Sequence, residues 1–190
     1  NTNFPTCVLY QSTTTWYLGR SGTGIDKSTD GGNTWNANST GMKGFAGSKI
    51  FISSSGRLFQ SNFGQGYNFS IDDGTTWNTV STGGANFALT GFVQLSDLSI
   101  LGYGYSGTIR SANDGNTWAV QQTTNPITNL YTADGTKLYY YTVSAIYLST
   151  NQGVTWSSLP ITGLPPGNIY NLVVDNTGNI YLIYYNSSTT

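Results

Sequence analysis

The sequence predicts an all-β fold built from a repeated unit, and two observations support this prediction. First, an octapeptide with the pattern Ser-x-Asp/Asn-x-Gly-x-Thr-Trp occurs four times, at residues 28–35, 70–77, 111–118 and 149–156. A period of about 40 residues with one glycine-containing turn in each period indicates a repeat array. Second, the intervening segments are short, rich in β-branched and aromatic residues, and bounded by Gly, Ser or Thr, which is typical of strands.

The chemistry of the octapeptide is that of a hairpin turn. Its central Gly can adopt a positive φ that other residues resist, and the Asp or Asn side chain can accept hydrogen bonds from nearby backbone N–H groups. Thr then re-enters a strand, and Trp offers a large apolar plate for packing between sheets. We therefore interpret these residues as structural, neither catalytic nor metal-binding. The positions are Ser28, Asp30, Gly32, Trp35, Ser70, Asp72, Gly74, Trp77, Ser111, Asn113, Gly115, Trp118, Ser149, Asn151, Gly153 and Trp156.

The four octapeptides resemble Asp-boxes, also called BNR repeats. These occur in sialidases, in some other glycoside hydrolases, in sortilin-type receptors and in assorted secreted β-propellers. The resemblance covers most of the chain and implies a β-propeller of four-stranded antiparallel blades. It places each octapeptide in the turn between the third and fourth strands, at the blade periphery and away from the ligand face. The resemblance therefore carries no functional residue over to this chain.

Each repeat divides into four predicted strands. The first repeat, residues 1–42, has them at 6–11, 15–20, 24–28 and 35–38. The second, residues 43–84, has them at 49–53, 57–62, 67–71 and 77–81. The third, residues 85–125, has them at 87–95, 99–103, 108–111 and 118–122. The fourth, residues 126–163, has them at 129–133, 137–142, 145–149 and 156–159.

The remaining residues, 164–190, predict half a blade. Segments 168–175 and 179–185 read as two strands, and no octapeptide follows them. The prediction is thus about four complete blades plus a partial fifth, and an open sheet edge invites association. Three interpretations remain: residues 2–4 lend a strand to the last blade, a neighbouring subunit supplies the missing strands, or the chain is part of a longer propeller.

Composition excludes several classes of function. Charged residues make up 8% of the chain, the net charge is −1, and Glu and His are absent. This balance argues against nucleic acid, which requires a basic stripe, and against polybasic attachment to a membrane. No apolar run approaches the roughly 18 residues of a membrane-spanning helix. Abundant Thr, Ser, Asn, Gly and Tyr are typical of extracellular surface proteins, so we expect an extracellular location. Cys7 lies in an apolar run and is predicted to be a buried thiol.

Candidate ligand-binding residues lie at the ends of the predicted second strands and in the turns that follow. In a propeller the second-to-third turns share one face with the blade-to-blade connections, near the central channel. Exposed Tyr beside Asn and Arg could stack on sugar rings and bond their hydroxyls; the alternative is that the Tyr side chains merely cover the sheet edges. The candidates are Arg20, Asn62, Tyr67, Tyr103, Tyr105 and Tyr141.

The sequence does not support an enzymatic site of the sialidase kind. That resemblance would require three convergent arginines, a Tyr–Glu pair and an acid Asp. Arg20, Arg57 and Arg110 are placed at different faces and are not expected to converge, and the chain has no Glu. A glycosidase of another type needs two carboxylates flanking a bond, and no such pair is evident. We therefore assign no catalytic residue, no metal ligand and no cofactor.

The expected function is that of a non-enzymatic extracellular binding or structural module. It would belong to a surface protein, adhesin or filament-like assembly, with glycans or neighbouring subunits as partners and with neither nucleic acid nor a membrane span. The alternative is a fragment of an Asp-box glycoside hydrolase, sialidase-like or β-glucanase-like, whose catalytic residues lie outside this chain.

Overall fold

The computed structural model describes residues 4–43, 47–62, 66–80, 88–123, 126–164 and 167–185. These residues form five antiparallel sheets in chain order, and none of them is helical. The first sheet has β1 (Pro5–Tyr10), β2 (Trp16–Arg20), β3 (Gly24–Ser28) and β4 (Asn36–Ala37). The second has β5 (Gly47–Ile52), β6 (Leu58–Asn62), β7 (Gly66–Ser70) and β8 (Asn78–Val80).

The third sheet has β9 (Leu89–Gln94), β10 (Ile100–Gly104), β11 (Gly107–Ser111) and β12 (Ala119–Gln122). The fourth has β13 (Leu138–Tyr141), β14 (Ile146–Ser149) and β15 (Ser157–Leu159). The fifth has β16 (Asn168–Val174) and β17 (Ile180–Tyr185). Each sheet is a meander in which consecutive strands pair, so the predicted strand order is confirmed.

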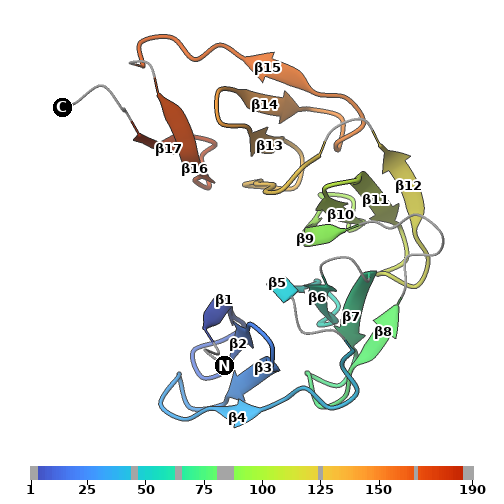
Figure 1. Ribbon diagram of the computed structural model, residues 1–190. Helices are drawn as coiled ribbons and strands as arrows, with labels where there is room; N and C mark the ends of the chain where they lie inside the picture. Colours follow the sequence, from blue (N-terminus) through green and yellow to red (C-terminus); the bar gives the residue numbers. More distant parts are fainter. Residues whose placement is uncertain are drawn as a thin grey trace.

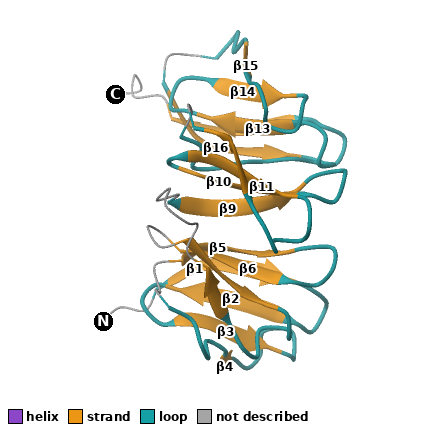
Figure 2. Ribbon diagram, turned by 90° about the vertical axis from the view of Figure 1, so that its right-hand side faces the viewer, coloured by secondary structure: helices purple, strands orange, loops and turns teal. Residues whose placement is uncertain are grey.

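The sheets are arranged as blades around a shared hub. Figure 1 shows an open arc in which β1, β5 and β9 lie on the inner side, while β4, β8 and β12 lie outside. Along this inner side β1 packs against β5, and β5 packs against β9. Seen from the side, the blades are stacked and their connections gather at the two ends of the strands (Figure 2). The predicted β-propeller architecture is confirmed.

The fourth blade departs from the prediction at its first strand. Residues 129–133 form no strand, and only an isolated bridge joins Tyr131 to Tyr139. Apolar side chains here pack between blades instead: Ile127, just before this segment, is fully buried, and Leu130, within it, is 4% exposed. The backbone N–H of Ile127 donates to the carbonyl of Gly104 at 2.9 Å. Packing between two blades therefore replaces the expected pairing within one blade.

Hydrogen bonds close each octapeptide turn. The hydroxyl of the first Ser accepts the backbone N–H of the Gly four residues on, for example Ser28 from Gly32 at 2.8 Å and Ser70 from Gly74 at 2.9 Å. The Asp30 carboxylate accepts both the backbone N–H and the hydroxyl of Thr34, at 2.9 and 2.6 Å. Gly74 has a φ of 82°, which suits glycine.

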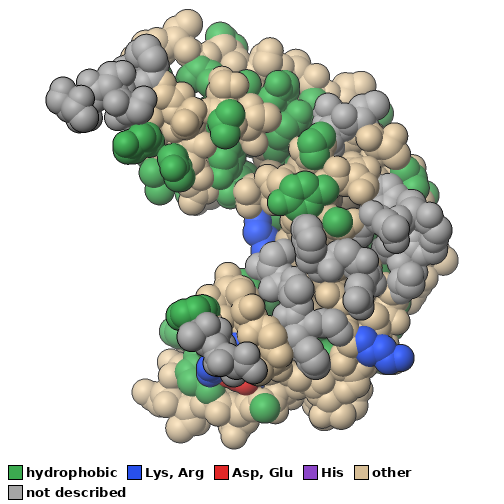
Figure 3. Space-filling view, in the orientation of Figure 1, with side chains coloured by type: hydrophobic (Ala, Val, Ile, Leu, Met, Phe, Trp, Pro, Cys, Tyr) green, Lys and Arg blue, Asp and Glu red, His purple; other side chains and the backbone are tan. Residues whose placement is uncertain are grey.

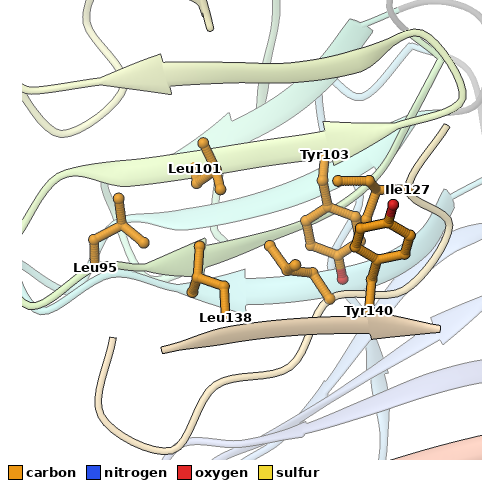
Figure 4. Packing of buried hydrophobic residues seen from close by; sticks show 7 residues of the cluster. Leu95, Leu101, Tyr103, Ile127, Leu138 and Tyr140 are labelled. Carbon is orange, nitrogen blue, oxygen red and sulfur yellow. The ribbon is translucent and has the colours of Figure 1, made fainter. Parts of the chain in front are cut away.

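Apolar clusters fill each interface between successive blades. The interface of the third and fourth blades is shown in Figure 4, where side chains from both sheets interdigitate. Its buried members are Leu95, Leu101, Tyr103, Ile127, Leu130, Leu138 and Tyr140. The interface of the second and third blades is mainly aromatic, with Phe59, Tyr67 and Phe92 in mutual ring contact. Because each interface has its own cluster, the core runs from blade to blade around the arc.

The fifth sheet buries one face and exposes the other. Ile169 and Leu172 pack against the fourth blade, whereas the outer face is apolar and exposed. We name this outer surface the half-blade face; it comprises Tyr170, Val173, Tyr181, Ile183 and Tyr185. At the other end of the arc, the carbonyl of Phe4 accepts the N–H of Ser21 at 3.0 Å, so Phe4 lies with the first blade. Residues 2 and 3 of the predicted lent strand lie outside the described residues.

Candidate functional site at the hub

The predicted equivalence of the second-strand ends holds in the structure. Arg20, Asn62 and Tyr141 are the last residues of β2, β6 and β13, and Tyr103 is the last but one of β10. The expectation that these side chains are exposed is wrong for three candidates. Asn62, Tyr67 and Tyr103 are each only 1% exposed.

Specific contacts explain this burial. The Asn62 amide donates to the carbonyl of Lys43 at 2.7 Å. Tyr67 lies between the second and third blades, and its hydroxyl donates to the carbonyl of Gly115 at 3.2 Å. Tyr103 packs in the next interface along the arc. Periodicity indicated the strand ends correctly, but it gave no information on how deeply neighbouring blades bury them.

The remaining candidates do not form one site. Arg20 is ion-paired with Asp26 of the same blade. Tyr105 is 53% exposed, in the turn between β10 and β11. Tyr141 is partly exposed, and its hydroxyl donates to the carbonyl of Tyr170 at 2.6 Å. Tyr141 is also a member of a cluster of side chains from several blades at the hub.

The three arginines have separate partners. Arg57 donates to the carbonyl of Asp114 and to the side chain of Asn116, both at 2.8 Å. Arg110 is ion-paired with Asp97. With Arg20 held by Asp26, these side chains occupy different blades and do not converge on a common point.

A different cluster joins the blades at the hub, and Lys49 is at its centre. The ammonium of Lys49, on β5, donates to the hydroxyl of Tyr103 and to the side-chain oxygen of Asn129, both at 3.1 Å. It also lies over the rings of Tyr103 and Tyr131, at 5.5 and 5.9 Å from their centroids. One side chain of the second blade thus reaches partners from the third and fourth. Figure 3 shows basic side-chain atoms on the inner wall of the arc.

Contacts with two neighbouring strands position Lys49. Its backbone N–H donates to the hydroxyl of Ser61 at 3.2 Å, at an irregularity in the pairing of β5 with β6. The Ser61 hydroxyl donates in turn to the carbonyl of Thr90 on β9. At Gly91 an added Cβ would lie 3.1 Å from the Lys49 side chain and 2.7 Å from the ring of Tyr103. The bare backbone of Gly91 therefore makes room for both side chains.

The cluster continues into the partial fifth blade. The hydroxyl of Tyr131 donates to the side-chain oxygen of Asn171, on β16, at 2.9 Å. The rings of Tyr131 and Tyr141 stack with centroids 6.3 Å apart. We name the set Lys49, Tyr103, Asn129, Tyr131, Tyr141 and Asn171 the hub cluster. All but Tyr103 are partly exposed, so the cluster forms a surface that a ligand can reach.

Burial dominates the electrostatics of the hub cluster. Desolvation lowers the pKa of Lys49 and raises that of Tyr103. Desolvation, followed by the nearby Tyr141, raises the pKa of Tyr131 to about 12. The ion pairs found within the described residues are Arg20–Asp26, Lys27–Asp73 and Arg110–Asp97, and none involves Lys49. The Lys49 ammonium thus contacts neutral oxygens and aromatic rings.

Four residues of the hub cluster were not predicted from the sequence: Lys49, Asn129, Tyr131 and Asn171. The predicted candidates lie at the ends of second strands, whereas these four residues belong to β5, to the segment before β13 and to β16, which occupy the inner positions of their blades. Polar residues in the first segment of each repeat could have indicated these positions.

Other possible sites are weaker. The described residues contain no group of three or more His, Cys, Asp or Glu that could hold a metal ion. They include no helix long and apolar enough to cross a membrane. A hollow of about 110 Å³ lies between the fourth and fifth blades, near Asp134 and Thr177. The Asp134 carboxylate there is already bonded to Thr136 within its own turn, so we prefer the hub cluster as the candidate site.

Comparisons with known proteins agree with the fold. Residues 102–184 match the model of the DUF6242 beta propeller domain. The structure of YCF48 bound to D1 peptide has a TM-score of 0.72 and 15% identity, covering 96% of this chain and 62% of that one. An ancestral GH74 enzyme has a TM-score of 0.73 and 16% identity, covering 96% of this chain and 27% of that one. A comparison with curated proteins found no match.

A third similar structure is PorZ, a surface component of the type-IX secretion system of Porphyromonas gingivalis. It has a TM-score of 0.62 and 18% identity, covering 94% of this chain and 23% of that one. At these identities the likeness shows the fold alone. The chain is therefore a β-propeller module, and it spans less than two thirds of the length of each of these three structures.

Proposed function

We propose that this chain is a non-catalytic binding module of an extracellular or cell-surface protein, and that it binds carbohydrate at the hub cluster. The partly exposed phenols and amides of Tyr131, Tyr141, Asn129 and Asn171 support this proposal. Amides and hydroxyls can bond sugar hydroxyls, and aromatic rings can stack on sugar rings. The chain's low charge and the likeness to PorZ, a bacterial surface component, support the location. On the basis of the four octapeptides, we also propose that the chain is related to Asp-box propellers.

Glycan-array binding tests this function. We expect the chain to bind a restricted set of glycans, and the variant Tyr141→Ala not to bind them. The control variant Tyr181→Ala, which truncates an exposed Tyr of β17, should bind the same glycans as the unchanged chain. Tyr105→Ala tests whether the exposed turn after β10 extends the site. Absence of binding to any glycan by the folded chain would refute the proposal.

A glycoside hydrolase fragment is the second candidate, and the likeness to the ancestral GH74 enzyme favours it. The chain matches 27% of that enzyme's length, so its catalytic residues would lie in the rest of such a protein. Release of reducing sugar from β-glucans or sialosides by a longer protein that contains this chain would support this candidate. No release across a broad panel would count against it.

For partners, we propose that a neighbouring subunit completes the partial fifth blade, as in an adhesin or a filament. The half-blade face is apolar and more than half exposed at each of its five residues. Among the described residues β17 pairs with β16 alone, so its other edge can accept a further strand. Sedimentation should show self-association that Ile183→Lys weakens. A strictly monomeric profile over a wide concentration range would remove this proposal.

A further inference from the structure

We infer that the hub cluster recognises the carboxylate of a uronic acid, so that the glycan bound by this module is an acidic one. The inference rests on the proposed carbohydrate binding and specifies the chemistry of its ligand. The surroundings of the Lys49 ammonium are unusual for a charged group.

The Lys49 ammonium has one donor to spare. An ammonium carries three N–H donors, and within the described residues two of them are used, by Tyr103 and Asn129. Both acceptors are neutral oxygens. The third N–H is available to a ligand that approaches from the hub.

The chain provides Lys49 with no counter-charge. All eight acidic residues are Asp and lie within the described part of the chain. Three are ion-paired with Arg20, Lys27 and Arg110. The carboxylates of the other five are exposed or act in turns; they are Asp30, Asp72, Asp114, Asp134 and Asp175. The Coulomb attraction between a partly buried cation and an external anion is stronger than that of a fully hydrated cation, because the local dielectric constant is lower.

The remaining groups of the hub cluster suit a sugar ring that carries this anion. The side-chain oxygens of Asn129 and Asn171 are used by Lys49 and Tyr131, whereas their amide nitrogens have no acceptor among the described residues. These nitrogens can donate to ring hydroxyls. Tyr141 stacks on Tyr131 and is partly exposed, so it offers apolar surface beside the ammonium.

The charge of the site matches a single carboxylate. Within the described residues Lys49 is the one cation bonded into the hub cluster, and no arginine fork is present there. A phosphate or a sulfate cluster is usually held by several cations or by a bidentate guanidinium. One ammonium with neutral donors around it favours a monoanionic carboxylate on a polyhydroxylated ring.

Calorimetry with two forms of one oligosaccharide tests the inference. The probes are tetragalacturonate and the same tetrasaccharide with its carboxyls methyl-esterified. We expect the free acid to bind about tenfold or more tightly than the ester, because close charge pairs at interfaces can couple by this much. Lys49→Met should abolish the difference. Lys137→Met, which removes an exposed lysine of the same charge and length elsewhere in the chain, should retain it.

A second variant keeps the test decisive if Lys49→Met unfolds. Asn129→Asp places a carboxylate at the position that now accepts the Lys49 bond, so Lys49 gains an internal counter-ion. This variant should fold and lose the preference for the free acid. Circular dichroism and thermal unfolding provide the check on folding.

The possible outcomes distinguish failure of the inference from failure of the proposed carbohydrate binding. Equal affinity for acid and ester would overturn the inference and leave carbohydrate binding intact. Failure of every glycan to bind would overturn both. Equally tight binding of a short peptide with a free terminal carboxylate would show that the cluster selects the anion without the sugar, and would also overturn the inference.

Discussion

The indole N–H of Trp118 donates to the hydroxyl of Tyr67 at 2.7 Å, and this bond joins the third octapeptide turn to the second blade. The same hydroxyl donates to the carbonyl of Gly115, within that turn. A similar link occurs one blade earlier, where the hydroxyl of Tyr17 donates to the carbonyl of Asp73 at 3.2 Å. The octapeptides thus close their own hairpins and also hold neighbouring blades in register.

Tyr67→Phe should lower the free energy of unfolding by about 1 kcal/mol, the usual net contribution of a buried hydrogen bond. The ring and its packing against Phe59 and Phe92 are retained, so the loss reports the hydroxyl. Urea unfolding measures it. Tyr170→Phe, at a Tyr that is 66% exposed, serves as the control, and an equal loss there would contradict the assignment.

Ser70→Ala should destabilise the chain by about 1–3 kcal/mol, because it leaves a buried N–H without its acceptor. The Ser70 hydroxyl accepts the N–H of Gly74 at 2.9 Å, and Ser70 is fully buried. Thermal unfolding compared with Ser158→Ala, at an exposed position of β15, isolates this effect. Equal stability of the two variants would disprove the role of the octapeptide Ser.

Lowering the pH should weaken the first two octapeptide turns and leave the last two octapeptide turns unaffected. Hydrogen bonds from the Thr34 side chain and backbone lower the pKa of Asp30 to about 2, and those from Thr76 do the same for Asp72. A folded-state pKa below the unfolded value of about 4 gives stability that is complete above pH 4 and is lost as the pH falls towards 2. The third and fourth turns carry Asn113 and Asn151, which do not titrate.

The double variant Asp30→Asn, Asp72→Asn should therefore fold at pH 7 and show a flatter stability profile between pH 4 and pH 2. Asn113 demonstrates that the substitution fits: its oxygen accepts the N–H of Thr117 at 2.9 Å, and its amide donates to the Thr117 hydroxyl at 2.8 Å. Chemical denaturation at several pH values measures the profile. An unchanged slope would show that these carboxylates do not govern acid sensitivity.

Gly91→Ala should disturb the hub cluster. The added Cβ would lie 2.7 Å from the Tyr103 ring, and such overpacking costs about 1–3 kcal/mol. Combined with Tyr103→Leu, the same change should cost less than the two single changes together, since the clash is then relieved. Thermal unfolding of the four proteins completes the cycle. Simple additivity would indicate that Gly91 and Tyr103 do not press on each other.

Local chemistry was readable from the sequence because it acts over a few residues. The octapeptide contains its own hydrogen-bond donors, acceptors and glycine, so it predicted where third and fourth strands meet. Short segments rich in β-branched and aromatic residues, bounded by Gly, Ser or Thr, predicted the strands that form to within about two residues, the usual uncertainty of such boundaries. The one strand predicted and not formed, at 129–133, belongs to a segment whose partners lie in other blades.

The sequence by itself determined the all-β repeat, the order of strands within each blade and the structural role of the octapeptides. Only the tertiary structure decided that Tyr67 and Tyr103 are buried between blades, and that Lys49 meets Asn129 at the hub, 80 positions away along the chain. The physical reason is range: a turn is closed by atoms within one octapeptide, whereas the hub cluster exists because successive blades pack at an angle that brings their inner segments together around one axis.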